Sequence, residues 1–376
     1  MSDQYQAIRE QFTALRHEKK ARHRDIAETL NISEGELIAA HVGVSPTERA
    51  CILHATGLRA EWSSIIESLE ALGEVMALTR NISCVHEKTG VYQKASHSNH
   101  MGLVLGGDID LRIFYQHWAH GYAVREITGD AAQATEPGEA GQTGQPTQQL
   151  SLQFFDASGL AIHKVFIKPQ SDVNAYEALV ARFASTEQIT GIQTSAAPEK
   201  LLELADATID VAGFRQAWSS LRDTHDFFGL LRKFAVTRTQ ALRLAEPQFV
   251  QKVEVSSCQD LLQAAATEGV PIMVFTGNAG MIQIHSGPVH KIAVMGPWVN
   301  VLDPRFNLHL REDHIASAWV VKKPTTDGLV TSLELFDADG ETIAMFFGER
   351  KPGKPELCEW RALIDQLLQE TESCAA

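Results

Sequence analysis

Hydrophobic and polar residues alternate in two stretches that resemble each other. Residues 151–159 (SLQFFDASG) and residues 332–340 (SLELFDADG) each end in an Asp/Gly turn, and a second hydrophobic run follows each turn. Period-two alternation on both sides of such a turn is typical of a β-hairpin. The sequence therefore predicts two related hairpins. Each is followed by a segment with helical character, over residues 174–183 in one case and residues 355–368 in the other.

The likeness extends to the segments that precede the hairpins. Residues 30–37 (LNISEGEL) resemble residues 234–241 (FAVTRTQA), and each segment follows a helix-like stretch with an aromatic-x-x-Leu-Arg pattern. Self-similarity of this length indicates that one α+β unit is present twice. We expect a first copy over residues 1–185 and a second copy, which carries the histidine discussed below, over residues 186–376.

One stretch of the first copy has no counterpart in the second. Residues 129–149 (GDAAQATEPGEAGQTGQPTQQ) are rich in Gly, Pro, Gln and Thr and contain no aromatic residue. This composition favours a loop inserted into a hairpin over a linker between domains.

The two copies also differ in the helical region before residue 234. Trp218, Leu221, His225, Phe228 and Leu231 are spaced as one apolar stripe of a helix, and His225 is its only polar member. The corresponding region of the first copy is charged and has no such histidine. A neutral imidazole on an apolar wall suits a metal ion bound through one nitrogen, while the other nitrogen bonds a partner that fixes the tautomer. A buried histidine bonded to a carbonyl group is the structural alternative.

A second difference lies in residues 110–118 (DLRIFYQHW). Their alternation predicts a strand with Arg112, Phe114 and Gln116 on one face. The second copy aligns Phe306 with Phe114 and has a proline in place of the arginine. An arginine on the same face as Phe114 can reach an aromatic pocket as a permanently charged donor, although a surface ion pair is the simpler interpretation.

Other histidines and lysines carry weaker signals. The spacing of the remaining histidines we considered is not diagnostic of a metal site, and we expect them on the surface: His97, His100, His285 and His290. Three lysines of the second copy are available for anionic carboxylates, although lysines are usually solvated: Lys291, Lys322 and Lys323.

Composition narrows the class of protein. With 33 Lys and Arg against 47 Asp and Glu, the 376-residue chain has a formal net charge of −14, which disfavours nonspecific binding of nucleic acid or anionic membranes. It has no apolar run long enough to span a bilayer and no signal-peptide pattern. Its 5 cysteines are scattered without a C-x-x-C pair, which argues against a disulfide framework or a structural zinc site. We therefore expect a cytoplasmic protein.

Common catalytic motifs are absent from the sequence. It contains no G-x-G-x-x-G, P-loop lysine, H-E-x-x-H or G-x-S-x-G pattern. Residues 24–37 do resemble a helix-turn-helix, with Ser33 and Glu36 spaced as a capping box. The expected recognition helix carries Glu34 and Glu36 but no lysine or arginine, so contacts to DNA phosphates would be difficult. Sequence-specific DNA binding stays a minor alternative.

Three segments carry a resemblance to a known family. The string RDTHDFFGLLR around His225, the DLRIF strand around Arg112, and residues 318–337 (AWVVKKPTTDGLVTSLELFD) are similar to the cytoplasmic haem-utilisation proteins called haemin-degrading factors, or HemS/ChuS-like proteins. The resemblance covers nearly the whole chain except residues 129–149. It implies a tandem duplication with large antiparallel sheets and a helical layer, and a haem cleft between helices and the C-terminal sheet.

The resemblance also implies roles for individual residues. His225 would be the axial ligand of the iron of haem b (iron protoporphyrin IX), and Arg112 would be the distal residue. Phe114 would pack on the Arg112 side, and Phe228 is one of the aromatic residues around His225. The propionates would be neutralised by Lys291 and Lys322, although the Lys-Lys pair at 322–323 departs from the family's Arg-Lys and puts a bidentate clamp there in doubt.

Two functions fit this resemblance. In the first, the protein accepts haem from an inner-membrane haem ABC transporter, holds it through the axial histidine and delivers it to a haem oxygenase. In the second, it opens the porphyrin itself with O₂ or peroxide, and Arg112 acts at the catalytic site. Since the chain has no flavin or nicotinamide motif, the electrons would come from an external donor. We favour haem binding and delivery and keep degradation as the alternative.

Overall fold

The computed structural model describes two compact units, each built mainly from one half of the sequence. The described residues are 2–45, 51–128, 147–196, 202–350 and 353–375. Unit 1 comprises residues 1–79, 89–197 and 278–281. Unit 2 comprises residues 80–88, 198–277 and 282–376. Each unit therefore includes a short segment from the other half of the chain. The predicted inserted loop at 129–149 lies outside the described residues, apart from its last three, which begin a strand.

Antiparallel strands form the centre of unit 1. Five strands are neighbours in the order β1 (Leu53–Gly57), β7 (His120–Thr128), β8 (Thr147–Phe155), β9 (Ala161–Ile167) and β2 (Val75–Arg80). Three more follow one another in the order β6 (Asp110–Phe114), β5 (Met101–Leu105) and β4 (Ala95–Ser98).

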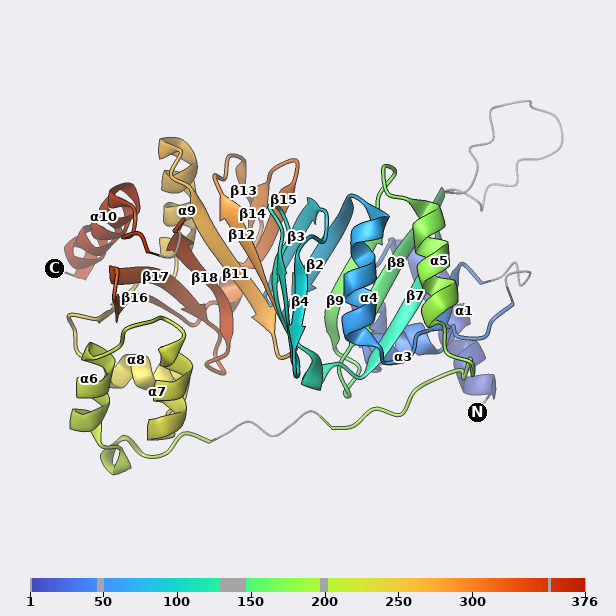
Figure 1. Ribbon diagram of the computed structural model, residues 1–376, viewed down its shortest axis with the longest axis horizontal. Coiled ribbons are helices and arrows are strands. Elements are labelled where there is room, and N and C mark those ends of the chain that lie inside the picture. The colour runs from blue at the N-terminus through green and yellow to red at the C-terminus, as the bar shows by residue number, and fades with distance from the viewer. Residues whose placement is uncertain (1, 46–50, 129–146, 197–201, 351–352, 376) are drawn as a thin grey trace. The chain divides into compact units, whose positions relative to one another are not determined.

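Helices cover both faces of the five-stranded part of unit 1 (Figure 1). Leu152 and Phe154 of β8 pack with α4 (Trp62–Ser68), the 3₁₀ helix η1 (Leu69–Leu72) and α5 (Val173–Phe183). Phe155 packs on the other face with α1 (Ser2–Lys19), α2 (His23–Thr29) and α3 (Glu34–Ala39). Both faces of β8 are therefore buried from Leu150 to Phe155, including the polar residues Ser151 and Gln153.

Unit 2 has the same kind of architecture. Six strands are neighbours in the order β10 (Val250–Val253), β16 (Ser317–Thr325), β17 (Gly328–Phe336), β18 (Thr342–Gly348), β11 (Ile272–Asn278) and β12 (Met281–Gly287). Four more have the order β3 (Cys84–Gly90), β15 (Phe306–Arg311), β14 (Trp298–Leu302) and β13 (Ile292–Met295). β16 pairs with β17, and β17 pairs with β18, in antiparallel fashion.

Two helical layers sandwich strands β16–β18 (Figure 1). Val320 and Leu333 lie in the cluster that includes α9 (Ser257–Glu268) and α10 (Cys358–Ala375). Val321 and Phe336 lie in the cluster that includes α6 (Val211–Ser219), α7 (Asp226–Phe234) and α8 (Arg238–Leu244). Because successive residues of a strand point to opposite faces, the positions of Val320 and Val321 also determine which face of β16 each following side chain points to.

The predicted hairpins are confirmed, and their details match between the two units. β8 pairs with β9, and β17 pairs with β18, in both cases with a register shift near the last residue of the first strand. Gly159 and Gly340 close the turns with φ of +81° and +77°, a conformation that favours glycine. The predicted helices follow as α5 and α10. The α+β fold with large antiparallel sheets is therefore confirmed, and the matching hairpins are consistent with a duplicated unit.

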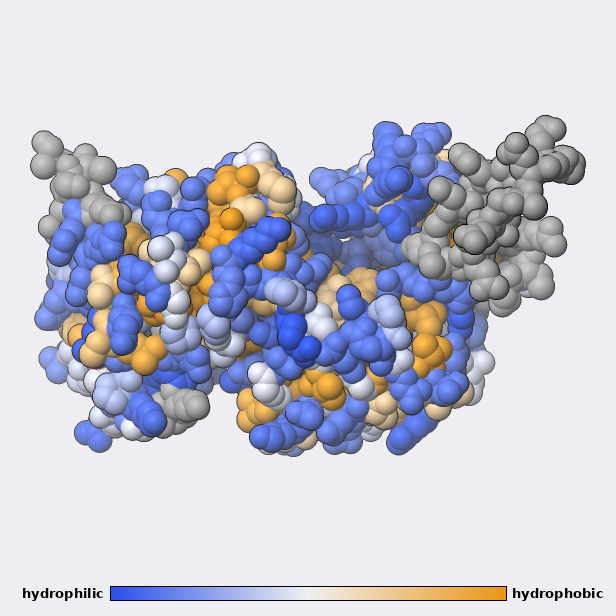
Figure 2. Space-filling view, turned by 90° about the horizontal axis from the view of Figure 1, so that it is seen from above, coloured by the Kyte–Doolittle hydropathy of each residue, from blue (hydrophilic) through white to orange (hydrophobic). Residues whose placement is uncertain are grey.

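The surface is mainly hydrophilic. In Figure 2 hydrophilic residues dominate the visible face, and apolar residues are interspersed among them. This agrees with the formal charge of −14. Among the residues that the structure describes, no helix is both long and apolar enough to cross a membrane.

Three buried histidines predict that stability falls in mild acid. Burial lowers the pKa of His41 to about 4, and that of His163 and His285 to about 3, from 6.5. The buried ring of His163 forms hydrogen bonds with Thr79 Oγ1 at 2.8 Å and with the Tyr92 hydroxyl at 2.6 Å. Since the folded state binds fewer protons than the unfolded state below pH 6.5, the free energy of unfolding decreases as the pH falls from 7 to 5.

We expect each of these histidines to contribute up to about 2 kcal/mol to that decrease. Urea unfolding at pH 7, 6 and 5 measures the change, and the variant His163→Gln should show a shallower pH dependence than the wild type. The exposed His290 provides a control for the substitution itself, because His290→Gln should leave the urea midpoint at pH 7 unchanged. Equal unfolding midpoints at pH 5 and pH 7 in the wild type would contradict the expectation.

Candidate functional site

The region around His225 is not one continuous helix, contrary to the prediction from its periodicity. α6 ends at Ser219, and α7 begins at Asp226. Between them, the Asp223 backbone N–H donates to the Asp226 carboxylate at 3.1 Å, and the His225 N–H donates to the Asp223 carboxylate at 2.8 Å. The first two N–H groups of α7, those of Asp226 and Phe227, donate to the carbonyl oxygens of Asp223 and Thr224, so a separate turn leads into this helix. The predicted single apolar stripe is therefore wrong.

His225 is an exposed side chain at the start of α7. Its side chain is 89% exposed, and its Nδ1 lies 2.6 Å from Asp223 Oδ1. A carboxylate only accepts, so Nδ1–H donates and the lone pair of Nε2 is left for a ligand. The hydrogen bonds from the His225 backbone and ring lower the pKa of Asp223, which keeps this carboxylate ionised. The arrangement is that of a metal-binding histidine oriented by an acid.

The aromatic residues near His225 have different positions. Trp218 and Phe227 are buried and pack edge-to-face, with ring centroids 4.9 Å apart. Phe228 is 62% exposed and lies three residues after His225, on the same side of α7. Of the three aromatic candidates, only Phe228 is available to a ligand from outside, whereas Trp218 and Phe227 hold the helix in place.

A buried ion cluster lies beneath α7, and the sequence did not single it out as a unit. Glu334 is fully buried, and its two carboxylate oxygens accept from Arg238 at 2.8 and 2.9 Å. Lys323 Nζ donates to the same carboxylate at 2.7 Å. Burial alone would raise the pKa of Glu334, but Arg238 and Lys323 hold it well below its usual range.

Both cations of this cluster also support the ring of Phe227. Arg238 and Lys323 lie 5.1 and 4.7 Å from its centroid. Burial lowers the pKa of Lys323, although Glu334 opposes that effect. Cation–π contacts to a desolvated ring are stabilising, so the cluster anchors the buried side of α7. One difference between the two repeats in the sequence marks this cluster. Residues 151–155 (SLQFF) have Gln153 where residues 332–336 (SLELF) have the charged Glu334.

Lys322 and Lys323 point to opposite faces of β16. Lys323 lies on the face covered by α6–α8, as its contact with Phe227 shows. Lys322 instead lines a pocket of about 340 Å³ together with Leu329, Thr331 and Arg361, on the face covered by α10. The structure therefore places the predicted propionate ligand Lys322 across the sheet from α7, whereas a sequence pattern alone could not assign the face.

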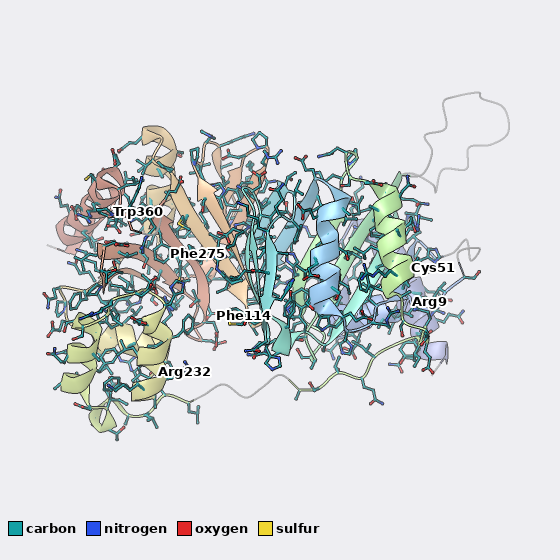
Figure 3. The ribbon with its side chains drawn as sticks, viewed as in Figure 1. Arg9, Cys51, Phe114, Arg232, Phe275 and Trp360 are labelled. Atoms are coloured by element: carbon teal, nitrogen blue, oxygen red, sulfur yellow. The ribbon has the colours of Figure 1, made fainter. Side chains whose placement is uncertain are left out.

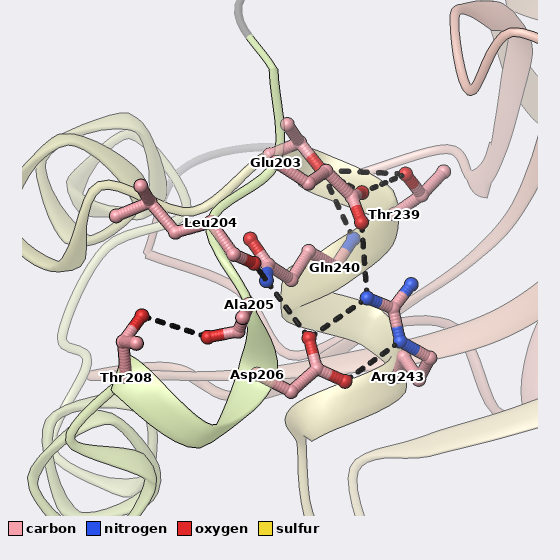
Figure 4. A network of polar contacts seen from close by, with 9 residues as sticks. Glu203, Leu204, Ala205, Asp206, Thr208, Thr239, Gln240 and Arg243 are labelled. Atoms are coloured by element: carbon pink, nitrogen blue, oxygen red, sulfur yellow. Dashed lines mark hydrogen bonds and ion pairs between the residues drawn. The ribbon is translucent and has the colours of Figure 1, made fainter.

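A chain of polar contacts fixes the segment that leads into α6 (Figure 4). Arg243 of α8 bonds Glu203 at 3.0 Å and Asp206 at 2.9 Å. Gln240 donates to the Leu204 carbonyl oxygen at 2.7 Å. These contacts raise the pKa of Arg243 above its usual range. They tie the approach to α6 onto α8 and so help to position the helical layer.

Arg112 and Phe114 lie in β6 of unit 1, and Figure 3 labels Phe114. Leu111 and Ile113 are fully buried, so Arg112 and Phe114 share the other, partly exposed face as predicted. Arg112 forms an ion pair with Asp110 of the same strand. The predicted alternation fails beyond Phe114, because residues 115–117 form a 3₁₀ turn and Gln116 does not continue the strand.

The remaining candidates of unit 2 are divided between surface and core. Lys291 is exposed just before β13, and its backbone N–H donates to Asp303 Oδ1 at 2.9 Å. His285 was expected on the surface, but it is buried and stacks on Phe306 with ring centroids 3.8 Å apart. Lys88 Nζ bonds its Nδ1 at 2.7 Å. Phe306 is therefore a core residue, unlike its aligned counterpart Phe114.

The helix-turn-helix pattern corresponds to α2 and α3, which form part of the core. The predicted capping box is confirmed: Ser33 accepts from the Glu36 N–H at 3.1 Å, and Glu36 accepts from the Ser33 N–H at 2.8 Å. Glu34 is buried in an ion pair with Lys164 of β9, and Leu37 is fully buried. A helix embedded in this way has little free surface for a DNA groove, which disfavours the DNA-binding alternative.

Comparison with known proteins identifies the relatives of this chain. The model of the haemin-degrading HemS/ChuX domain matches residues 31–183 and 235–367. The hemin transport protein HemS of Yersinia enterocolitica is 37% identical over 363 residues, which cover 96% of this chain and 97% of the relative.

Two solved structures are also similar. Holo-PhuS, described as a heme-binding protein from Pseudomonas aeruginosa, has a TM-score of 0.87 and 42% identity, over 96% of this chain and 99% of PhuS. ChuS, described as an Escherichia coli heme oxygenase, has a TM-score of 0.78 and 35% identity, over 96% of this chain and 99% of ChuS. The relatives of this chain thus include a hemin transport protein, a heme-binding protein and a heme oxygenase.

Proposed function

Since the chain belongs to the haemin-degrading HemS/ChuX family, we propose that it binds haem b through His225 in the cytoplasm and delivers it to a separate haem oxygenase. The observation that carries this proposal is the exposed imidazole of His225, whose Nδ1 is held by Asp223 at 2.6 Å while Nε2 is free to bind iron. A haem site needs an axial donor, an aromatic contact and cations near the propionates. His225 and Phe228 supply the first two at the start of α7.

The other residues have separate proposed roles. Arg112, with Phe114 beside it on β6, is the proposed distal residue, and its guanidinium would donate hydrogen bonds on that side of the haem. Lys291 is exposed and remains a proposed propionate partner. Lys322 is a weaker candidate, because it lies on the α10 face of the sheet, opposite α7. An inner-membrane haem ABC transporter is the proposed source of the haem.

The alternative is that this chain degrades haem, as the description of ChuS as a heme oxygenase suggests. Haem would then be the substrate, O₂ or peroxide the oxidant, and an external donor would supply the electrons. Arg112 would become a catalytic residue. The exposed position of His225 fits both functions, since an axial ligand is needed for each.

Titration of the full chain with ferric haem tests the proposal. We expect saturable binding of one haem per chain with the absorption spectrum of a histidine complex. The complex is then incubated with ascorbate, with and without catalase. A carrier yields no open tetrapyrrole when catalase is present, whereas a tetrapyrrole that survives catalase identifies the enzyme. Binding that does not saturate at a defined stoichiometry would overturn both.

The variant Arg112→Ala is expected to change the ferric haem spectrum, and the dependence of that spectrum on pH, more than it changes haem affinity. A distal guanidinium acts on the ligand opposite His225 and adds little to the Fe–N bond itself. Arg112→Lys keeps the positive charge and serves as the matched control. Absorption spectra from pH 6 to pH 10 measure the effect. Superimposable spectra for wild type and Arg112→Ala would place Arg112 outside the haem site.

A further inference from the structure

The outer face of α7 combines four exposed residues in one row. His225, Phe228, Gly229 and Arg232 follow one another at spacings of three, four and seven residues from the histidine, so they share one side of the helix. All four are exposed. The opposite side of α7 is buried through Phe227 and its neighbours. One face of the helix thus carries an imidazole, an aromatic ring and a guanidinium, and it has no side chain at Gly229.

Gly229 is the unusual member of this row. Glycine inside a helix is unfavourable relative to alanine because it loses more backbone freedom on folding. Other helical glycines of the chain have a packing reason: a Cβ on Gly35 would lie 2.9 Å from the Gly159 backbone, and one on Gly213 would lie 2.2 Å from the Asp210 carboxylate. A Cβ on Gly229 would meet nothing within 4 Å. No contact in the described chain requires glycine there.

Arg232, the last residue of the row, carries a positive charge that no described acidic side chain neutralises. Within the described part of the chain it has no side-chain hydrogen bond or ion pair, in contrast to Arg238 and Arg243 on the neighbouring helix. Figure 3 labels Arg232 on α7. Seven residues of helix separate it from His225, which is about 10 Å along the axis. That span is comparable with the distance from the iron to a propionate carboxylate in protoporphyrin.

We propose that the porphyrin lies along the outer face of α7, where Gly229 leaves room for the edge of the ring against the helix backbone and Arg232 binds a propionate. This inference rests on the proposed haem-binding function and specifies how the ligand is seated. A side chain at position 229 would fill the space between the ring held by His225 and the helix. A guanidinium is suited to a carboxylate because it can donate two parallel hydrogen bonds.

The variants Gly229→Ala and Gly229→Leu test whether the porphyrin needs the space that Gly229 leaves beside the backbone of α7. In the apoprotein, Gly229→Ala is expected to raise the midpoint of thermal unfolding, because alanine favours the helix and meets no obstacle. The same variant should weaken ferric haem binding on the order of tenfold, and Gly229→Leu should weaken it further. Thr267→Ala on α9 is the control: it also improves helix propensity, but should leave haem binding unchanged.

Two iron-free probes separate this inference from the proposed function. Metal-free protoporphyrin IX cannot be ligated by His225, yet it should still bind more weakly to the Gly229 variants. Arg232→Gln should lower the affinity for protoporphyrin IX on the order of tenfold, but it should not lower the affinity for the dimethyl ester of protoporphyrin IX. Arg232→Lys keeps the positive charge and should therefore lose less affinity for protoporphyrin IX than Arg232→Gln.

Each outcome decides one of the two proposals. Wild-type affinities for haem and protoporphyrin IX in the Gly229 variants, or equal effects of Arg232→Gln on the acid and the ester, would overturn the seating on α7. A ferric spectrum without histidine ligation in the wild type, combined with the expected losses in these variants, would instead overturn the role of His225 and support the porphyrin-binding face.

Discussion

Replacement of His225 by alanine is expected to weaken ferric haem binding by about 100-fold or more, equivalent to about 2.7 kcal/mol. The side chain is 89% exposed and makes no packing contact that the fold depends on, so the apoprotein should keep its stability. The loss therefore reports on the bond between Nε2 and the iron. Haem titration followed by absorption spectroscopy measures both affinity and ligation, and thermal unfolding of the apoprotein verifies that the fold is intact.

Two further variants make the His225 experiment specific. Asp223→Asn keeps the shape of the residue that holds Nδ1 at 2.6 Å but weakens the hydrogen bond, and it should reduce haem affinity by about tenfold. His290→Ala removes another exposed histidine of unit 2 and should have no effect. An unchanged Soret band and affinity in His225→Ala would exclude this residue as the axial ligand, whatever the effect of Asp223→Asn.

The sequence allowed the duplicated elements to be predicted because their signals are local. Alternation on both sides of an Asp/Gly turn depends only on neighbouring residues, and the glycines at 159 and 340 adopt the expected positive φ. The helix break before His225 is also local, but there two signals compete. The apolar spacing favours one helix, whereas the carboxylates of Asp223 and Asp226 bond backbone N–H groups of the turn between α6 and α7 and so favour a break.

Other features depend on long-range packing that one sequence does not contain. Lys322 and Lys323 are adjacent, so alternation requires opposite faces but does not say which face meets α7. His285 is flanked by turn residues typical of a surface, yet it is buried against Phe306. The exposed row on α7, with Gly229 in it, depends on where the helix starts, which packing against the sheet helps to determine.

The two halves of the chain place opposite charges at equivalent helix starts, and each charge pairs with a different strand of the hairpin. In unit 1 the acid is on the helix, where Glu34 at the start of α3 pairs with Lys164 of β9. In unit 2 the base is on the helix, where Arg238 at the start of α8 pairs with Glu334 of β17. The sheet residue equivalent to Glu334 in unit 1 is the neutral Gln153. Unit 2 therefore has a buried carboxylate at a place where unit 1 has an amide, and this carboxylate pairs with two cations under the helix that follows His225.

Removal of that carboxylate is expected to destabilise unit 2 strongly. Glu334→Gln leaves the buried Lys323 and the partly buried Arg238 without a counterion, and breaking a buried ion pair in this way typically costs about 3–5 kcal/mol. The loss should appear as a lower urea midpoint. It should also weaken haem binding, because both cations contact Phe227 and so hold the buried side of α7.

The matched variant Lys323→Met separates charge balance from packing at the same place. It leaves the two-bond pair of Arg238 and Glu334 intact and keeps an unbranched chain beneath Phe227, so the free energy of unfolding should change by less than about 1 kcal/mol. The double variant Lys323→Met/Glu334→Gln should recover part of the loss caused by Glu334→Gln, because one unpaired cation remains instead of two. If Lys323→Met proved as destabilising as Glu334→Gln, with no recovery in the double variant, packing and not charge balance would hold α7 in place.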